Sequence, residues 1–173
     1  MKSIYKIHYI VFFLALFFSK AIAEPTLVQS KSIDIGFYLG LTFNNDGTKM
    51  YTAESDKKVD PIVEYILTTP YDISTATVNN TKIVHRGGSN SSHIPSQVVF
   101  NNDGTKMFIS NHTGSFIEYY SLTTAFDIST ATFDDQKDIS GQEIRANSFA
   151  FNNDGTRMIV AGAGNESQHR IHE

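Results

Sequence analysis

The chain has 173 residues, of which 40% are hydrophobic and 18% are charged, a formal net charge of −4 and no cysteine. This composition is typical of one folded domain, or part of one, and excludes a disordered chain of low hydrophobicity. The lack of cysteine excludes a disulfide scaffold, a thiolate metal site and a cysteine nucleophile. The acidic balance argues against a nucleic-acid partner, which favours a basic surface.

The first 23 residues predict a secretory signal peptide. Lys2 and Lys6 precede the apolar run Ile10–Phe18, and Ala21-Ile22-Ala23 forms an A-x-A cleavage site. We expect cleavage between Ala23 and Glu24, no membrane span after removal of the signal, and a secreted or periplasmic protein. The apolar run is about half of the roughly 20 residues that a membrane helix needs. An uncleaved N-terminal anchor is the alternative, because Lys20 lies close to the cleavage site.

Two sequence blocks recur along the rest of the chain. Phe43–Met50 (FNNDGTKM) returns unchanged at Phe100–Met107 and, with one Lys-to-Arg difference, at Phe151–Met158. A second block begins at Ile62–Tyr65 and at Phe116–Tyr119, and continues in both copies with Leu-Thr-Thr and Asp-Ile-Ser-Thr-Ala-Thr. An eight-residue match of this kind identifies an internal repeat.

Each repeat predicts four short β-strands. In the first repeat we expect strands at 39–43, 49–53, 61–67 and 76–84, with a tight turn at Asn45-Asp46-Gly47. No sustained helical periodicity follows residue 23. Four antiparallel strands in a unit of this size are typical of a β-propeller blade, so the predicted fold is all-β.

The motif Phe-x-x-Asp-Gly-x-x-Met-Tyr/Phe resembles the F-S-P-D-G-x-x-L-Y-V-A pattern of YVTN, NHL and WD-type propellers, with Asn-Asn in place of Ser-Pro. The block Glu-Tyr-x-Leu-Thr-Thr followed by Asp-Ile-Ser-Thr-Ala-Thr resembles repeats of exported bacterial proteins of uncharacterised function. The resemblance covers residues 24–173 and implies a propeller fold. It says little about activity, because propellers include enzymes, binding proteins and scaffolds.

The predicted blades do not form a complete ring. Residues 24–38 contain a stray fourth strand that resembles the ring-closing strand of propellers; 39–95 form blade 1, 96–146 blade 2 and 147–173 a partial blade 3. This is an incomplete propeller of under three blades, against the typical four to eight. We expect a fragment of a longer protein. Ring completion by identical chains and an open stack are the alternatives, and the open blade edges predict self-association.

No residue pattern indicates catalysis, a metal or a cofactor. The Asn-Asn-Asp-Gly turns lack the alternating acids and distal Glu of a calcium loop, and the histidines lack zinc-site spacing. No Gly-x-Ser-x-Gly elbow occurs. Glu64 and Glu118 recur with a following Tyr and are interpreted as equivalent structural residues of the third strands. We therefore predict no catalytic, metal-binding or cofactor-binding residue, and no cofactor.

The loops predict a binding face. In a blade, the turns after strands one and three share one side, and the turn after strand two shares the other with the inter-blade loops. Only the second set varies between the repeats, and scaffold-held loops often carry function. Its predicted ligand contacts are Arg86, His93, His112 and Arg145.

The predicted function is that of a binding or surface-interaction module, with a protein, glycan or small molecule as the unidentified ligand. The alternative is part of a propeller enzyme, either a lactonase-like hydrolase or a quinone-dependent dehydrogenase. A remnant without function is a third hypothesis.

Overall fold

The computed structural model describes residues 30–32, 37–55, 61–83, 94–141, 145–163 and 169–172. The predicted signal peptide and cleavage site, Arg86 and His93 lie outside these ranges. The described part contains eleven strands and two single-turn 3-10 helices, η1 (Ile73–Thr75) and η2 (Ile128–Thr130), which confirms the all-β prediction. None of the described residues belongs to a helix of the length and hydrophobicity that a bilayer crossing requires.

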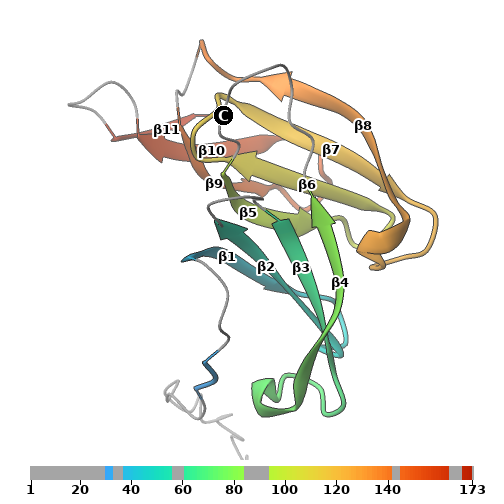
Figure 1. Cartoon of the computed structure of the whole chain (residues 1–173). Helices are drawn as coiled ribbons and strands as arrows, with labels where there is room; N and C mark the ends of the chain where they lie inside the picture. Colours follow the sequence, from blue (N-terminus) through green and yellow to red (C-terminus); the bar gives the residue numbers. More distant parts are fainter. Residues whose placement is uncertain are drawn as a thin grey trace, which may run out of the picture.

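The strands form three antiparallel sheets in chain order, as Figure 1 shows. We call the sheet β1-β2-β3-β4 blade 1, the sheet β5-β6-β7-β8 blade 2 and the sheet β9-β10-β11 partial blade 3. These sheets are partial propeller blades, as the sequence predicts. The strands are β1 (Phe37–Phe43), β2 (Lys49–Ser55), β3 (Pro61–Leu67), β4 (Ala76–Ile83), β5 (Pro95–Phe100), β6 (Lys106–Asn111), β7 (Phe116–Leu122), β8 (Ala131–Asp138), β9 (Ala146–Phe151), β10 (Met158–Ala163) and β11 (His169–His172).

Side chains within the shared motif form the hairpin turns. Asp46 Oδ1 accepts hydrogen bonds from the backbone N–H and the hydroxyl of Thr48, at 2.9 and 2.6 Å. Gly47 has φ +72°, a left-handed conformation that glycine adopts without strain. Strand β1 starts two residues before its predicted beginning, because Phe37 and Tyr38 pair with the end of β2 ahead of a bulge.

The strand register corrects the predicted equivalence of Glu64 and Glu118. Lys49 and Lys106, at the same place in the motif, pair with Ile66 and Ser121 respectively. Counting back from these pairs, Tyr119 is the counterpart of Glu64, and Glu118 is the counterpart of Val63. The two glutamates therefore lie on opposite faces of their sheets, since side chains alternate along a strand.

Blade 1 packs face to face on blade 2. We call the face of a blade that looks toward the next blade its forward face, and the opposite face its rear face. Among the described residues, the largest buried cluster receives Tyr51, Ala53 and Ile62 from the forward face of blade 1. The rear face of blade 2 contributes Val98, Met107, Ile109 and Tyr120, among others. Burying one such large apolar side chain contributes roughly 1.5–3 kcal/mol.

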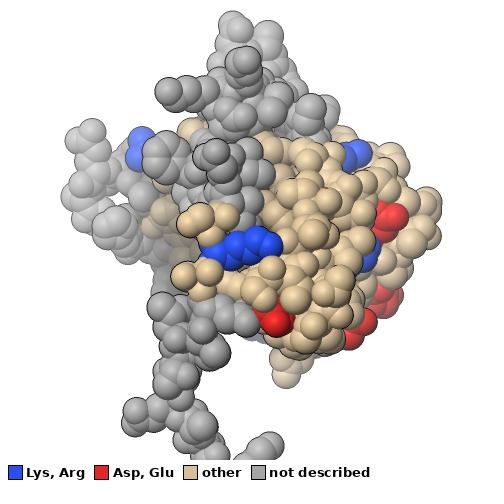
Figure 2. Space-filling model, turned by 60° about the horizontal axis from the view of Figure 1, so that its bottom comes forward, with Lys and Arg blue, Asp and Glu red and all other residues tan. Residues whose placement is uncertain are grey.

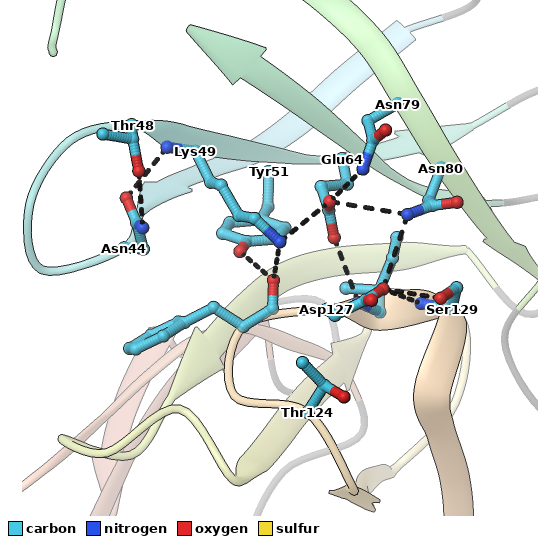
Figure 3. A network of polar contacts seen from close by, with 12 residues as sticks. Asn44, Thr48, Lys49, Tyr51, Glu64, Asn79, Asn80, Thr124, Asp127 and Ser129 are labelled. Atoms are coloured by element: carbon cyan, nitrogen blue, oxygen red, sulfur yellow. Dashed lines mark hydrogen bonds and ion pairs between the residues drawn. The ribbon is translucent and has the colours of Figure 1, made fainter.

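A buried ion pair of blade 1 makes hydrogen bonds to blade 2 at this junction, as Figure 3 shows. Glu64 is fully buried and lies 3.1 Å from Lys49 Nζ. Its Oε1 accepts a hydrogen bond from Asn79, and its Oε2 accepts one from the backbone N–H of Ile128 in blade 2. Lys49 also donates to the carbonyl of Phe126, again in blade 2. The ion pair is therefore shared between the two blades.

Tyr51 adds a second polar link. Its hydroxyl donates to the same Phe126 carbonyl at 2.6 Å, and its ring centroid lies 4.5 Å from that of Phe100. Burial and the nearby Glu64 carboxylate raise the pKa of Tyr51, so the hydroxyl remains a donor at physiological pH. One side chain thus contributes both apolar contact and a hydrogen bond to the junction.

Replacing Lys49 tests how much the Lys49–Glu64 ion pair contributes to the free energy of unfolding. Lys49→Met leaves the Glu64 carboxylate buried without a cation, and should lower the free energy of unfolding by about 2–4 kcal/mol in urea titrations. Lys106→Met, at the same motif position, is the matched control. Its pair with Asp134 is about half exposed, at 47% and 35%, so the loss should stay below about 1 kcal/mol. Equal losses in the two variants would contradict a special role for the junction.

Replacing Gly40 tests the close approach of the inner strands. A Cβ at Gly40 in β1 would lie 2.5 Å from the Ser96 carbonyl and 2.8 Å from the Gln97 Cα, both in β5. Because backbone cannot yield as a side chain can, Gly40→Ala should cost about 1–3 kcal/mol of unfolding free energy. At Gly141 a Cβ would meet no atom within 4 Å, so Gly141→Ala should change stability by less than about 0.5 kcal/mol.

Candidate functional site

The β6–β7 turn is held by one asparagine. Asn111 is 2% exposed, and its Oδ1 accepts hydrogen bonds from the backbone N–H groups of Thr113 and Gly114, at 3.0 and 2.7 Å. Such a side chain replaces the ladder bonds that a turn lacks. The turn therefore presents the next residue, His112, from a fixed backbone.

A buried pair of hydroxyls joins this part of blade 2 to partial blade 3. The Oγ atoms of Ser96 and Ser110 lie 2.8 Å apart, and Ser96 donates to the carbonyl of Ala146 at 2.6 Å. Ser96 is 5% exposed and Ser110 is 0% exposed. Because Ala146 is the first residue of β9, these contacts place the start of β9 beside the start of β5 and the end of β6.

His112 meets the start of β9. Its Nδ1 lies 2.6 Å from the side-chain oxygen of Asn147, a contact in which the ring nitrogen donates because the amide oxygen can only accept. Arg145 lies two residues before Asn147 and is exposed. A polar region thus forms where the β6–β7 turn reaches the inter-blade segment, and we call His112, Arg145 and Asn147 the polar junction.

Two of the four predicted ligand contacts belong to this region. His112 and Arg145 lie in neighbouring loops, whereas Arg86 and His93 lie outside the described residues. Sequence reasoning missed Asn147, Ser96 and Ser110. Asn147 directly follows the inter-blade stretch between blades 2 and 3, which varies between the repeats and is a usable signal. The two serines carry no pattern, because their contact depends on the packing of separate strands.

In the ranges that the structure describes, no three or more histidine, aspartate or glutamate residues gather to hold a metal ion.

A pocket of about 690 Å³ lies between blade 2 and partial blade 3, on the side of the Asn-Asn-Asp-Gly turns. Phe100, Phe108 and Phe151 give it apolar walls, and Asp103, Lys106 and Asp154 lie at its polar parts. At the junction of blades 1 and 2 the corresponding space contains Phe126, whose ring lies 5.5 Å from that of Phe100. The pocket therefore corresponds to the space that the Phe126 side chain fills at the junction of blades 1 and 2.

The aspartates of the three hairpin turns have a structural role. Hydrogen bonds from the hydroxyl and backbone N–H of Thr48 hold the pKa of Asp46 below its ordinary value. Thr105 lowers the pKa of Asp103 in the same way, and Thr156 that of Asp154. These contacts stabilise the turn, which is the role that the sequence predicts for the motif.

These pKa values predict acid sensitivity. Because the carboxyls have a lower pKa in the folded than in the unfolded chain, their contribution to stability is complete above the ordinary aspartate pKa of about 3.9 and disappears as the pH falls through the lowered values. Urea midpoints should therefore fall as the pH is lowered from about 5 through the ordinary aspartate pKa and below it. The triple variant Asp46→Asn, Asp103→Asn, Asp154→Asn should show a smaller fall. An unchanged pH profile in this variant would exclude the turns as the cause.

Solved structures share this arrangement of strands. The periplasmic gluconolactonase of Pseudomonas aeruginosa superposes with a TM-score of 0.57 and 16% identity, over 76% of this chain and 34% of that one. A protein of Bacteroides uniformis assigned as a 6-phosphogluconolactonase gives 0.52 and 13%, over 78% and 35%. A functionally unknown protein of Desulfotomaculum acetoxidans gives 0.50 and 17%, over 72% and 36%. These similarities establish a propeller-like fold.

The chain spans about a third of the length of these solved structures. No protein-family model matches the sequence, and no curated protein matches it either.

Proposed function

We propose that the protein is an exported propeller of the YVTN, NHL or WD kind that binds a small sugar acid or an acidic glycan at the polar junction. The observation that carries this proposal is the contact between His112 and Asn147, which connects a turn of blade 2 with the start of partial blade 3. Arg145 directly precedes β9. Contacts from two blades are what a propeller offers to a ligand on its loop face.

The chemistry of the three side chains favours this class of ligand. A guanidinium group matches the geometry of a carboxylate and can bind both of its oxygens. Imidazole and carboxamide groups donate to and accept from sugar hydroxyls. The buried contacts of Ser96 and Asn111 hold the surrounding backbone, so the ligand would not have to order it.

A lactonase-type hydrolase is the second candidate. Its support is the similarity of fold to the periplasmic gluconolactonase, which is also consistent with a periplasmic location. A lactone and the corresponding sugar acid share their hydroxyl pattern, so the polar junction suits either. Hydrolysis needs in addition a group that activates water.

Gluconate and glucuronate are suitable probes for calorimetric titration. We expect binding that weakens at least about tenfold, equivalent to about 1.4 kcal/mol, in Arg145→Ala and in His112→Ala. Arg157→Ala is the matched control, because Arg157 is exposed but follows the Asn-Asn-Asp-Gly turn on the other side of the blade. Binding that Arg157→Ala weakens as much as Arg145→Ala, or no binding of either acid, would overturn the proposal.

Glucono-δ-lactone separates the two candidates. Acid release in a pH-stat that disappears in His112→Ala and Arg145→Ala would support the hydrolase. Binding of gluconate without hydrolysis of the lactone would support the binding module.

A further inference from the structure

The two ring nitrogens of His112 have different surroundings. Nδ1 lies 2.6 Å from the side-chain oxygen of Asn147, and Nδ1 donates because that oxygen only accepts. Nε2 makes no hydrogen bond with the described residues, and it is not among the polar side-chain atoms that are buried there without a partner. Nε2 is therefore open to solvent and to a ligand.

The contact at Nδ1 decides what Nε2 can do. A neutral imidazole carries one ring proton, so a proton held on Nδ1 leaves a lone pair on Nε2. Nε2 is then a hydrogen-bond acceptor, whereas in the other tautomer it would be a donor. Asn147 thus sets the hydrogen-bonding character of an atom that it does not touch.

The backbone on both sides of this contact is tied to the start of β5. The backbone N–H of His112 donates to the carbonyl of Ile94 at 2.7 Å. On the other side, Ser96 donates to the carbonyl of Ala146, the residue before Asn147, at 2.6 Å. Because residues 94 and 96 are neighbours in the chain, the two partners are held relative to each other. A ligand would therefore meet a histidine whose tautomer is already selected.

Overall charge does not favour the binding of an acid. The chain has a formal net charge of −4, which repels anions at long range. Figure 2 brings forward the end of the molecule that blade 1 occupies in Figure 1. On its described surface, Lys, Arg, Asp and Glu residues stand at separate places among uncharged residues. Recognition of a sugar acid then depends on short-range contacts, including those to its hydroxyl groups.

We propose that His112 Nε2 is a specificity-determining acceptor of the polar junction, and that Asn147 is its positioning residue. The inference rests on the proposed function and narrows its ligand to an acid that carries a free hydroxyl group. The hydroxyl group donates its proton to Nε2. A carboxylate without hydroxyl groups offers Nε2 no proton, so its binding would leave a desolvated acceptor without a partner.

Heteronuclear NMR of the ring nitrogens measures the tautomer without any ligand. At about pH 9, where an ordinary imidazole is neutral, we expect the proton of His112 on Nδ1. A His112→Gln variant identifies the signals by their loss. A proton on Nε2 in the unmodified chain would overturn the inference.

Replacing Asn147 tests its positioning role in the same measurement. Asn147→Ala should give averaged signals of the two tautomers, because nothing then fixes the proton. Asn147→Asp keeps an acceptor and should retain the proton on Nδ1. Ser148→Ala is the control, because Ser148 is the next residue of β9 and is exposed. An unchanged tautomer in Asn147→Ala would contradict the positioning role.

Calorimetric titration with gluconate and hexanoate tests the selectivity. The two acids have carbon chains of equal length, but hexanoate has no hydroxyl group. We expect gluconate to bind at least about tenfold more tightly, and the preference to become smaller in Asn147→Ala. Ser148→Ala should keep the full preference.

His112→Lys separates an acceptor from a positive charge. Lysine has three donors and no acceptor, so gluconate binding should weaken at least about tenfold although the variant adds a cation near an anion. His112→Gln keeps an acceptor and should bind gluconate more tightly than His112→Lys does. Equal or tighter binding by His112→Lys than by the unmodified chain would overturn the acceptor role. Circular dichroism checks that each variant is folded.

Failure of the inference differs from failure of the proposed function. If the unmodified chain binds neither acid, the proposed function is wrong and the selectivity with it. If gluconate binds but hexanoate binds equally well, or if the proton is on Nε2, only the inference is wrong.

Discussion

The structure depends on the face-to-face contact between blade 1 and blade 2. A four-stranded sheet with an apolar face must pack that face against another element. At this junction apolar packing around Tyr51 and the buried ion pair of Glu64 act together. The carboxylate is tolerated there because Lys49, Asn79 and the Ile128 N–H all contact it.

The contact between blade 2 and partial blade 3 uses different side chains from the contact between blades 1 and 2. Phe108 stands where blade 1 has Tyr51, and Tyr119 stands where it has Glu64. Aromatic packing of Phe108 with Phe151, at 4.7 Å, takes the place of the polar link. Repeats that share their turns therefore differ in the residues that join neighbouring blades.

The two sides of the blades differ, because the turns on one side repeat almost unchanged and those on the other vary between the repeats. In the Asn-Asn-Asp-Gly turns, each aspartate accepts a hydrogen bond from the threonine of the same motif. Because these turns need the same residues, this side is nearly identical between the copies. On the other side, turns of different length bring unlike side chains together, as His112 and Asn147 show. The fold similarity to solved propellers does not by itself assign a ligand, because function in this architecture belongs to the loops.

The sequence alone determined the hairpins, the four-stranded units and the all-β class, because Asn-Asp-Gly turns and alternating strands are local properties of the chain. It could not determine that Glu64 is a junction residue and Glu118 is not its counterpart. A shift of one residue between the repeats reverses the face to which a side chain points, and only strand pairing reveals it. Likewise, the polar junction joins residues 35 positions apart, a contact that the packing of separate blades decided.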